Sequence, residues 1–328
     1  MISKTKFYLR RATVPAENIA IEAFLTESVP AETCVLYLWQ NRKTVVIGRN
    51  QNAWRECRVD ALERDGGFLA RRLSGGGAVF HDCGNLNFTF AMNSADYDLE
   101  RQLAVILDAV RALGVPAEKS GRNDILASGK KFSGNAFYHH AGKSYHHGTL
   151  MVDVALDSLA DYLNVPAEKL VAKGVSSVRS RVANLADFVP GLTIAQLAAA
   201  LRLSFEKIYG SAPEILRDED FENVPRVSEL TQKFASWEWR LGRKMPFSWR
   251  AETRFPWGGF EIRALADAGK IVSAEVFSDA MDDAFPREIA TALAGAKFGV
   301  GGMLSALAPL ADSPQLTDVR KFISEQNL

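Results

Sequence analysis

The sequence predicts a mixed α/β protein that consists of a large N-terminal domain and a smaller α+β domain at the C-terminal end. Segments with helical periodicity alternate with strand-like segments from the beginning of the chain. The length of 328 residues favours two domains or one large one, and the 47% hydrophobic content suffices for a packed core. Four tryptophans between positions 237 and 257 mark a change in composition. We therefore predict domains at 1–246 and 247–328.

The first third of the chain predicts one helix followed by strands. Apolar side chains recur at helical spacing between residues 15 and 29. Segments rich in β-branched and aromatic residues predict strands, and these segments are 34–40, 44–49, 69–72 and 78–80. Residues 85–91 alternate apolar with polar side chains, so we expect a half-buried strand there.

The middle of the chain predicts two further helices and a hairpin. Apolar residues follow helical spacing over 103–113 and again over 193–209. Short strand-like pairs on either side of Ser128-Gly129 predict a hairpin, which places Asp124 and Lys131 on neighbouring strands. Residues 149–154 predict another strand, and the polar stretch at 211–227 indicates a surface excursion.

The C-terminal segment predicts a small module of its own. Residues 260–266 and 270–277 are strand-like, and helical patterns follow Pro286 and Asp312. A module of about eighty residues has a plausible size for an accessory domain.

Composition excludes several classes of protein. Lysine plus arginine and aspartate plus glutamate both number 39, so the chain has no basic footprint for nucleic acid. No window is apolar enough for a membrane span, and the N-terminus lacks a signal sequence, so we expect a cytoplasmic protein. Cys34, Cys57 and Cys83 are an odd, widely spaced set that predicts free thiols rather than disulfides or a zinc site.

The segment Arg71-Arg72-Leu73-Ser74-Gly75-Gly76-Gly77 is the strongest local signal. Its spacing fits neither the P-loop nor the dinucleotide fingerprint, because Phe80 stands where the latter needs a third glycine. What remains is a glycine turn that joins two strands. Such a turn is either purely structural or lets backbone amides approach a phosphate.

Basic residues gather in and beside this segment although the whole chain is neutral. They are Arg71, Arg72, Arg122, Lys130, Lys131, Lys173, Arg179 and Arg181. They form either solvated faces or a small anion site, with too few charges for duplex binding and enough for a triphosphate.

Five motifs in order give the chain a family resemblance. They are Arg71 to Asp82, Gly121 to Asp124, Lys131 to Ala136, His146 to Leu150 and Lys173 to Leu185. In this order they closely resemble the bacterial lipoate-protein ligase A family, and the match runs through essentially the whole chain. The resemblance implies an α/β catalytic domain of the biotin and lipoate ligase superfamily with a smaller C-terminal domain.

The resemblance also implies a two-step, ATP-dependent ligation. Lipoate and MgATP would give lipoyl adenylate and pyrophosphate, after which one lysine of a lipoyl domain attacks the mixed anhydride and releases AMP. The implied acceptors are the lipoyl domains of 2-oxoacid dehydrogenase complexes and the glycine-cleavage H protein. No nucleic-acid or membrane partner is expected.

Lys131 is the implied catalytic residue. A carboxylate that attacks an α-phosphate builds negative charge on oxygens, which fixed cations and amide donors stabilise. The bland alternative is a solvated hairpin lysine. Asp124 would bind Mg²⁺, because magnesium at nucleotides is usually held by one or two carboxylates; it could instead cap a turn.

The resemblance assigns the remaining site residues by motif. The implied ATP contacts are Arg72, Gly77, Ala78, Val79, Phe80, Asn123, Asp124 and Lys131. The implied lipoate contacts are Ser74, Gly75, Gly76, Lys131, His147 and Gly148. Arg72 could instead form a surface ion pair, and His147 could be only a packed histidine.

A loop over 173–185 has the composition of a mobile segment. We expect it to close over the adenylate and exclude water, with Lys173, Ser177, Val178, Arg179 and Arg181 as its contacts. The five histidines fall as one single and two adjacent pairs, which argues against a metal cluster.

Two other functions remain as alternatives. An octanoyl or lipoyl transferase would need no ATP and would use a cysteine nucleophile, for which Cys83 beside His81 is the candidate. We expect Cys83 to be a small buried residue instead. A lipoate-binding protein without catalysis is the other alternative, and the presence of Lys131, Asp124 and a C-terminal module argues against it.

Overall fold

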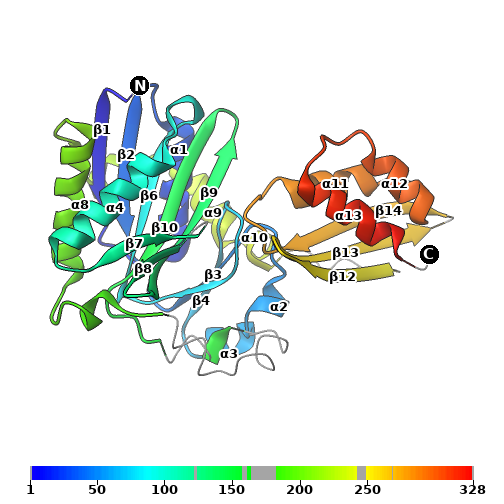
Figure 1. The fold of residues 1–328 in the computed structure, drawn as a ribbon, viewed down its shortest axis with the longest axis horizontal. Coiled ribbons are helices and arrows are strands. Elements are labelled where there is room, and N and C mark those ends of the chain that lie inside the picture. The colour runs from blue at the N-terminus through cyan, green and yellow to red at the C-terminus, as the bar shows by residue number, and fades with distance from the viewer. Residues whose placement is uncertain are drawn as a thin grey trace.

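The structure is a computed structural model. It describes residues 2–121, 124–156, 161–163, 182–241, 249–267 and 269–326, with only the backbone of Trp54 and Arg55. Figure 1 shows a larger N-terminal part built around a sheet and a smaller C-terminal part in which three helices lie against a second sheet. The predicted fold class, a mixed α/β catalytic domain followed by a smaller α+β domain, is confirmed.

Within the described residues, the large domain is built on an eight-stranded mixed sheet with the order β11-β1-β2-β6-β10-β9-β8-β7. The strands are β1 (Lys4–Leu9), β2 (Thr33–Trp39), β6 (Asn85–Asn93), β7 (Ala117–Ser120), β8 (Asp124–Ala127), β9 (Lys130–His140), β10 (Lys143–Met151) and β11 (Glu214–Leu216). β1 pairs in parallel with β2 and β11, whereas the other neighbours are antiparallel.

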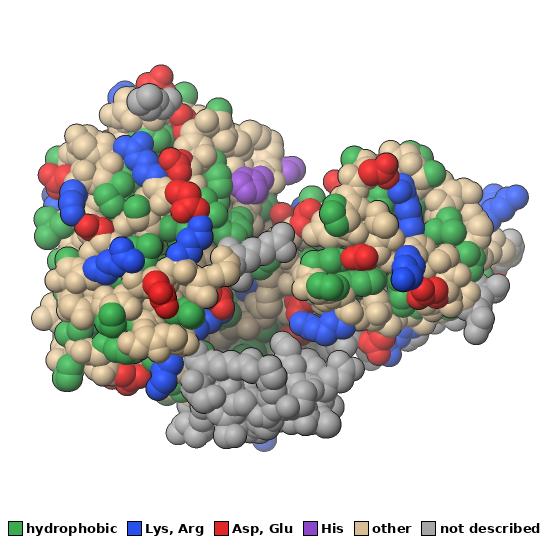
Figure 2. Space-filling view, in the orientation of Figure 1, with side chains coloured by type: hydrophobic (Ala, Val, Ile, Leu, Met, Phe, Trp, Pro, Cys, Tyr) green, Lys and Arg blue, Asp and Glu red, His purple; other side chains and the backbone are tan. Residues whose placement is uncertain are grey.

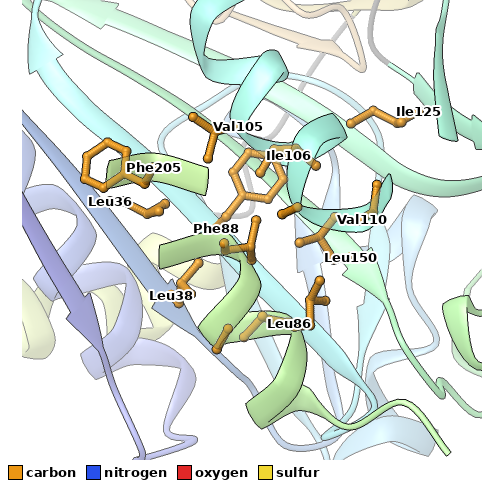
Figure 3. Packing of buried hydrophobic residues seen from close by; sticks show 14 of the residues in the cluster. Leu36, Leu38, Leu86, Phe88, Val105, Ile106, Val110, Ile125, Leu150 and Phe205 are labelled. Carbon is orange, nitrogen blue, oxygen red and sulfur yellow. The ribbon is translucent and has the colours of Figure 1, made fainter. Parts of the chain in front are cut away.

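Helices cover both faces of this sheet. α4 (Leu99–Ala112) and α8 (Ile194–Tyr209) pack on one face, and α1 (Pro15–Ser28) and α9 (Pro225–Ala235) pack on the other. Figure 3 shows Phe88 of the sheet beside Ile106 of α4 and Leu150 beside Val110 of the same helix, with Phe205 of α8 near Leu36. Each fully buried side chain of this kind stabilises the fold by about 1.5 to 3 kcal/mol.

Local signals fix where these helices begin and end. The Asp98 side chain accepts a hydrogen bond from the Arg101 amide at the start of α4. Thr193 and Gln196 form a capping box at the start of α8, and Gly210 ends it with a φ of 75°. Short 3-10 helices lie at Ser94–Asp96, Leu185–Asp187 and Asp218–Asp220.

A small three-stranded sheet stands beside the large one. It has the order β4-β3-β5, with β3 (Thr44–Ile47), β4 (Phe68–Arg71) and β5 (Val79–His81), and the short helices α2 (Ala53–Glu56) and α3 (Val59–Arg64) lie between β3 and β4 in the chain. β4 runs parallel to β3, and β5 runs antiparallel on its other side. The glycine segment therefore joins two strands, as predicted, but it crosses the end of β3 instead of closing a hairpin.

The C-terminal domain is an antiparallel three-stranded sheet with helices against one face. Its elements are β12 (Trp249–Phe255), β13 (Gly258–Asp267), β14 (Lys270–Ser278), α11 (Phe285–Leu293), α12 (Val300–Leu307) and α13 (Pro314–Ser324). A core that includes Phe260, Ile262, Ile289, Met303 and Val319 holds the two layers together. α10 (Trp237–Leu241) precedes it, and the predicted boundary at 246/247 lies in 242–248, outside the described residues.

Several predicted elements need correction. β6 is buried on both faces and not half-buried, because α1 and the small sheet together cover the face that carries its polar residues. The excursion at 211–227 contains the edge strand β11, and the strand predicted at 149–154 begins earlier, at Lys143. β12 and α12 were not predicted. In the part of the chain that the structure describes, no helix is both long and apolar enough to cross a membrane.

Candidate active site

A cavity of about 190 Å³ lies between the large sheet and the small sheet. Trp39, Asn87 and Thr149 form a row across its floor, because Trp39 pairs with Asn87 on β6 and Asn87 pairs with Thr149 on β10. Val46 and Val79 of the small sheet line it from the other side. A largely apolar lining with a few convergent polar groups suits an elongated ligand with one polar end.

Many of the predicted site residues line this cavity. They are Arg72, Gly76, Gly77, Ala78, Val79, Lys131, His147 and Gly148. Ser74, Gly75, Phe80 and Asp124 are not among its lining residues, and the Phe80 ring stacks on Tyr162 in a separate core. Asn123, Lys173, Ser177, Val178, Arg179 and Arg181 lie outside the described residues, as does the rest of 164–181.

Arg72 holds the glycine segment in shape. Its side chain is buried, and it donates to the carbonyl oxygens of Gly75 and Gly77 at 2.6 and 2.8 Å and to Ser74 Oγ at 3.0 Å. A further bond reaches Val46 O at 3.2 Å. The alternative of a surface ion pair is wrong, because this guanidinium is buried and donates to carbonyl and hydroxyl oxygens. Burial lowers the pKa of Arg72 to about 10.

Arg71 has the same kind of role one residue earlier. It donates to the carbonyl oxygens of Gly48, Arg49 and Gln51 and, across the domain, to those of Trp239 and Arg240. Trp239 returns a bond from its indole nitrogen to the Arg71 carbonyl at 2.9 Å. The two arginines thus fix the backbone around the cavity.

The C-terminal domain closes one side of the glycine segment. The Gly76 amide donates to Ala280 O at 2.8 Å, and Met281 lines the cavity. Gly76 has a φ of 87°, and a Cβ at Gly75 would lie 2.4 Å from Ala280 O, so this contact requires glycine. Asn50 adds two bonds between the domains: it donates to Asp283 O at 2.8 Å and accepts from the Ser278 amide at 2.9 Å.

A buried hydrogen-bonded chain joins helix α1 to the glycine segment through His147. Glu22 Oε1 contacts His147 Nδ1 at 2.7 Å, and His147 Nε2 contacts Ser74 Oγ at 2.8 Å. Thr89 donates to the same Glu22 oxygen at 2.6 Å. The order resembles a hydrolytic triad, but Ser74 is fully buried and does not line the cavity. The chain therefore positions the segment and does not offer a nucleophile.

Lys131 lies at the other end of the floor, on β9. Its Nζ is 2.8 Å from Asp124 Oδ1 on β8, which confirms the predicted proximity of these two residues. Its side chain is 35% exposed. Gly134 lets the ammonium reach the floor, because a Cβ at that position would lie 3.1 Å from Lys131 Nζ.

Asp124 provides the carboxylate beside Lys131 in the described part of the chain, so a metal ion there would have few protein ligands. Asp124 is 36% exposed in its side chain and could ligate Mg²⁺ through one oxygen. Among the described residues no group of three or more His, Cys, Asp or Glu side chains could hold a metal ion. This fits a magnesium bound mainly by a nucleotide's phosphates and by water, and it does not fit a protein-built metal cage.

The cysteines are free thiols, as predicted. Cys83 is exposed, so the expectation of a buried residue is wrong, and it is not among the residues that line the cavity. It stands after β5 in the turn that leads into β6, where its carbonyl accepts from the Gln40 side chain. Burial raises the pKa of both Cys34 and Cys57 to about 12, which makes them poor nucleophiles.

Several residues at the site were not predicted as site residues, notably Glu22, Trp39, Asn87 and Met281, and His81 was considered only as a neighbour that could activate Cys83. Glu22 carried a usable signal: it lies on α1 among Ile19 and Ala23, where a carboxylate on a buried helix face needs a partner. Asn87 was interpreted only as the polar side of a strand. Met281 reaches the cavity from another domain, which no local pattern reveals.

Comparison with known proteins agrees with this architecture. The family model described as "Lipoyl protein ligase A/B catalytic domain" matches residues 14–206, and "Bacterial lipoate protein ligase C-terminus" matches residues 244–321. Plasmodium falciparum LipL1, solved in complex with lipoate, shares the fold with a TM-score of 0.87 and 24% identity over 98% of this chain and 100% of that chain.

Two further solved structures are similar over the larger part of the chain. The bi-partite lipoate protein ligase of Thermoplasma acidophilum, described with its E2 lipoyl domain, is 28% identical with a TM-score of 0.64, over 74% of this chain and 98% of that one. A lipoate-protein ligase A bound with ATP is 27% identical with a TM-score of 0.63, over 73% and 99%. Since the catalytic-domain model spans more than half of the sequence, this chain belongs to the lipoyl protein ligase A/B family.

Proposed function

We propose that this protein joins lipoate to a specific lysine of lipoyl domains in an ATP-dependent reaction with a lipoyl-adenylate intermediate. The observation that carries the proposal is the placement of Lys131. Its ammonium lies at one end of a narrow, largely apolar cavity, next to Gly134 and the Asp124 carboxylate. An acyl chain in the cavity would present its carboxylate to this cation.

In the first step a carboxylate oxygen of lipoate attacks the α-phosphorus of ATP, the bond to the β-phosphate bridging oxygen breaks, and pyrophosphate leaves. Lys131 would stabilise the charge on the carboxylate and α-phosphate oxygens. The backbone of Gly76 to Val79 lines the cavity on the opposite side and is proposed to contact the nucleotide and the acyl chain. Arg72 would act by holding this backbone, together with the chain from Glu22 through His147 to Ser74.

In the second step the amine of the acceptor lysine attacks the acyl carbon. The bond from this carbon to the AMP oxygen breaks, AMP leaves, and the amine loses a proton as the amide forms. Lys131 would polarise the same carbonyl. Mg²⁺ would neutralise phosphate charge when MgATP is bound, with Asp124 as its protein ligand. Because Lys131 occupies one oxygen of Asp124, that pair would loosen when the nucleotide enters.

The proposed acceptors are the lipoyl domains of 2-oxoacid dehydrogenase complexes and the glycine-cleavage H protein. The Thermoplasma relative is described with its E2 lipoyl domain, and this supports the first class. Figure 2 shows acidic and basic side chains interspersed on the visible face and a recess between the two parts of the molecule. We propose that the acceptor lysine enters on the Lys131 side of the cavity.

The transferase alternative is less well supported, since Cys83 is exposed and is not among the residues that line the cavity. The test of the proposed function is the exchange of radiolabelled pyrophosphate into ATP, with and without lipoate. Exchange that depends on lipoate establishes the adenylating ligase. Transfer of an acyl group from a carrier-protein thioester without ATP, in place of exchange, would establish the transferase.

A further inference from the structure

His81 of β5 has an imidazole that the mechanism above does not use. It is 3% exposed, lines the cavity and lies edge-on to Trp39, with ring centroids 6.3 Å apart. Within the described residues its Nε2 has no hydrogen-bond partner, although the atom is buried. Several described side chains have a buried polar atom without a hydrogen-bond partner. Among them, only His81 lines the cavity.

A chain of hydrogen bonds determines which nitrogen of His81 carries the proton. Arg10 Nε can only donate, and it donates to Asn18 Oδ1 at 2.8 Å. Asn18 Nδ2 must then face acceptors, which are Gln40 O at 2.7 Å and Asn41 Oδ1 at 3.0 Å. The Asn41 amide nitrogen is thereby turned toward His81 Nδ1, at 3.3 Å. His81 Nδ1 must accept, so the proton of the neutral ring is on Nε2.

A second asparagine pair is consistent with this tautomer. Asn85 Nδ2 donates to Asn87 Oδ1 at 3.0 Å, so the nitrogen of Asn87 is free to face His81 Nδ1, at 3.5 Å. Burial, followed by the neighbouring Arg72 and His147, lowers the pKa of His81 to about 3. The ring is therefore neutral at neutral pH, with one fixed tautomer and one unused donor.

The position of His81 indicates which part of a ligand it meets. Trp39, Asn87, Thr149 and Gly134 follow one another across β2, β6, β10 and β9. Three strand spacings of about 4.8 Å separate the first from the last, or roughly 14 Å. Lys131 lies beside Gly134, whereas His81 packs on Trp39. An acyl chain whose carboxylate contacts Lys131 thus extends toward His81 with its far end.

We propose that His81 is a specificity-determining residue, whose Nε2–H donates a hydrogen bond to an acceptor atom at the far end of the acyl chain. This inference rests on the proposed function, because it takes Lys131 as the carboxylate end. A ring sulfur of lipoate is an acceptor, though a weak one, whereas the terminal methyl of octanoate is none. With octanoate the buried donor stays unpaired. The cavity therefore favours lipoate over a plain eight-carbon acid.

Two substitutions separate the two ring nitrogens. In His81→Gln the amide nitrogen takes the place of Nε2 and keeps a donor at the cavity. In His81→Asn the amide oxygen takes the place of Nδ1, so it still accepts from Asn41 while the donor at the cavity is lost. The control is His140→Gln, which alters an exposed histidine at the end of β9. Binding of lipoate and of octanoate is measured by calorimetry without ATP.

We expect His81→Asn to weaken lipoate binding by about two- to tenfold, as for one modest hydrogen bond. Octanoate binding should change little, and His81→Gln should retain most of the preference. An equal loss for both acids would place His81 at the carboxylate end and overturn the proposal. An unchanged preference in His81→Asn would overturn it as well.

A spectrum of the wild-type protein keeps the proposal testable if the variants do not fold. Long-range ¹H–¹⁵N correlation of the histidine rings should show His81 as the Nε2–H tautomer, with a shift of its Nε2 signal on adding lipoate and a smaller one with octanoate. An Nδ1–H tautomer, or equal shifts, contradicts the proposal. If ATP–pyrophosphate exchange fails but the protein still prefers lipoate to octanoate, only the proposed adenylation is rejected. If exchange occurs but the preference for lipoate does not depend on His81, only this inference is rejected.

Discussion

Replacing Lys131 with alanine should abolish both half-reactions and leave the fold intact. The side chains of Lys131 and Asp124 are 35% and 36% exposed, so their ion pair is well solvated. Exposed pairs of this kind contribute about 0 to 1 kcal/mol to stability. The backbone carbonyl of Lys131, which accepts from the Ala183 amide at 2.9 Å, is unaffected by the substitution. A urea titration should therefore give nearly the wild-type free energy of unfolding.

The catalytic loss should be much larger. One preorganised donor aimed at developing charge typically contributes about 3 to 4 kcal/mol, or ~10² to 10³ in rate. Adenylate formation is measured by ATP–pyrophosphate exchange with lipoate, and transfer by single turnover of synthetic lipoyl adenylate onto a lipoyl domain. Both rates should fall, because the same ammonium is proposed to contact the carboxylate in one step and the carbonyl in the other.

The matched control is Lys130→Ala, which removes an exposed lysine from the preceding position of the same strand. It should leave both rates within about twofold of the wild type, because a solvated charge that touches no ligand adds little. Near-normal adenylate formation by Lys131→Ala would refute the assignment. Equal losses in the two variants would show that only the general charge of the hairpin matters.

Further predictions concern the other groups at the site. Cys83→Ser should retain ATP-dependent lipoyl transfer, measured on a lipoyl domain; loss of activity together with ATP-independent octanoyl transfer would instead support the transferase. Gly134→Ala should displace the Lys131 ammonium by a few tenths of an ångström and slow exchange by roughly tenfold, with little change in the urea midpoint; an unchanged rate would mean that this close approach is unimportant. Glu22→Ala should lower the free energy of unfolding by about 1 to 3 kcal/mol for each buried partner that it leaves unpaired, whereas Glu22→Gln should cost clearly less; equal costs would argue against the hydrogen-bonded chain. Burial lowers the pKa of His81 and of His146 to about 3. The unfolded chain therefore binds more protons than the folded protein below pH 6.5, so this contribution to the free energy of unfolding is complete above pH 6.5 and is lost as the pH falls toward 3. The expected loss by pH 5 is about 2 kcal/mol for each histidine. Equal free energies of unfolding from urea titrations at pH 7 and pH 5 would contradict this.

The sequence predicted the elements with a strong local pattern and the residues within compact motifs. The hairpin that carries Asp124 and Lys131 was predictable because Ser128-Gly129 is typical of a two-residue turn, whereas the bulge that pairs Asp124 with Gly134 had no local signal. Alternation on 85–91 correctly indicated a strand, but it could not show that α1 and the small sheet bury the polar side. β12 was missed because its exposed, charged residues obscure the strand pattern.

What the sequence could not predict depends on long-range contacts. Arg71 and Arg72 were expected in solvated faces or in a small anion site because their charge is visible in the sequence. The sequence did not show that Arg72 binds the carbonyl groups of its own glycine segment, or that Arg71 reaches those of Trp239 and Arg240. The tautomer of His81 depends on four residues from different segments, and Met281 reaches the cavity from the second domain. Local propensity carries no information on such arrangements, which arise only when the tertiary fold is complete.

Three hydrogen bonds join the glycine segment and Asn50 to residues 278–283 of the C-terminal domain. They bear on whether the two domains could function as separate polypeptides. These three hydrogen bonds, the number that these groups form within the described residues, would by themselves hold two separate chains together only weakly, and the cavity wall made by Met281 would then depend on protein concentration. Joining both parts in one polypeptide supplies an effective concentration in the millimolar range for short linkers. The Thermoplasma relative is described as bi-partite. If the chain were cut between its two domains, dilution alone should separate them and so remove Met281 from the side of the cavity beside Gly76.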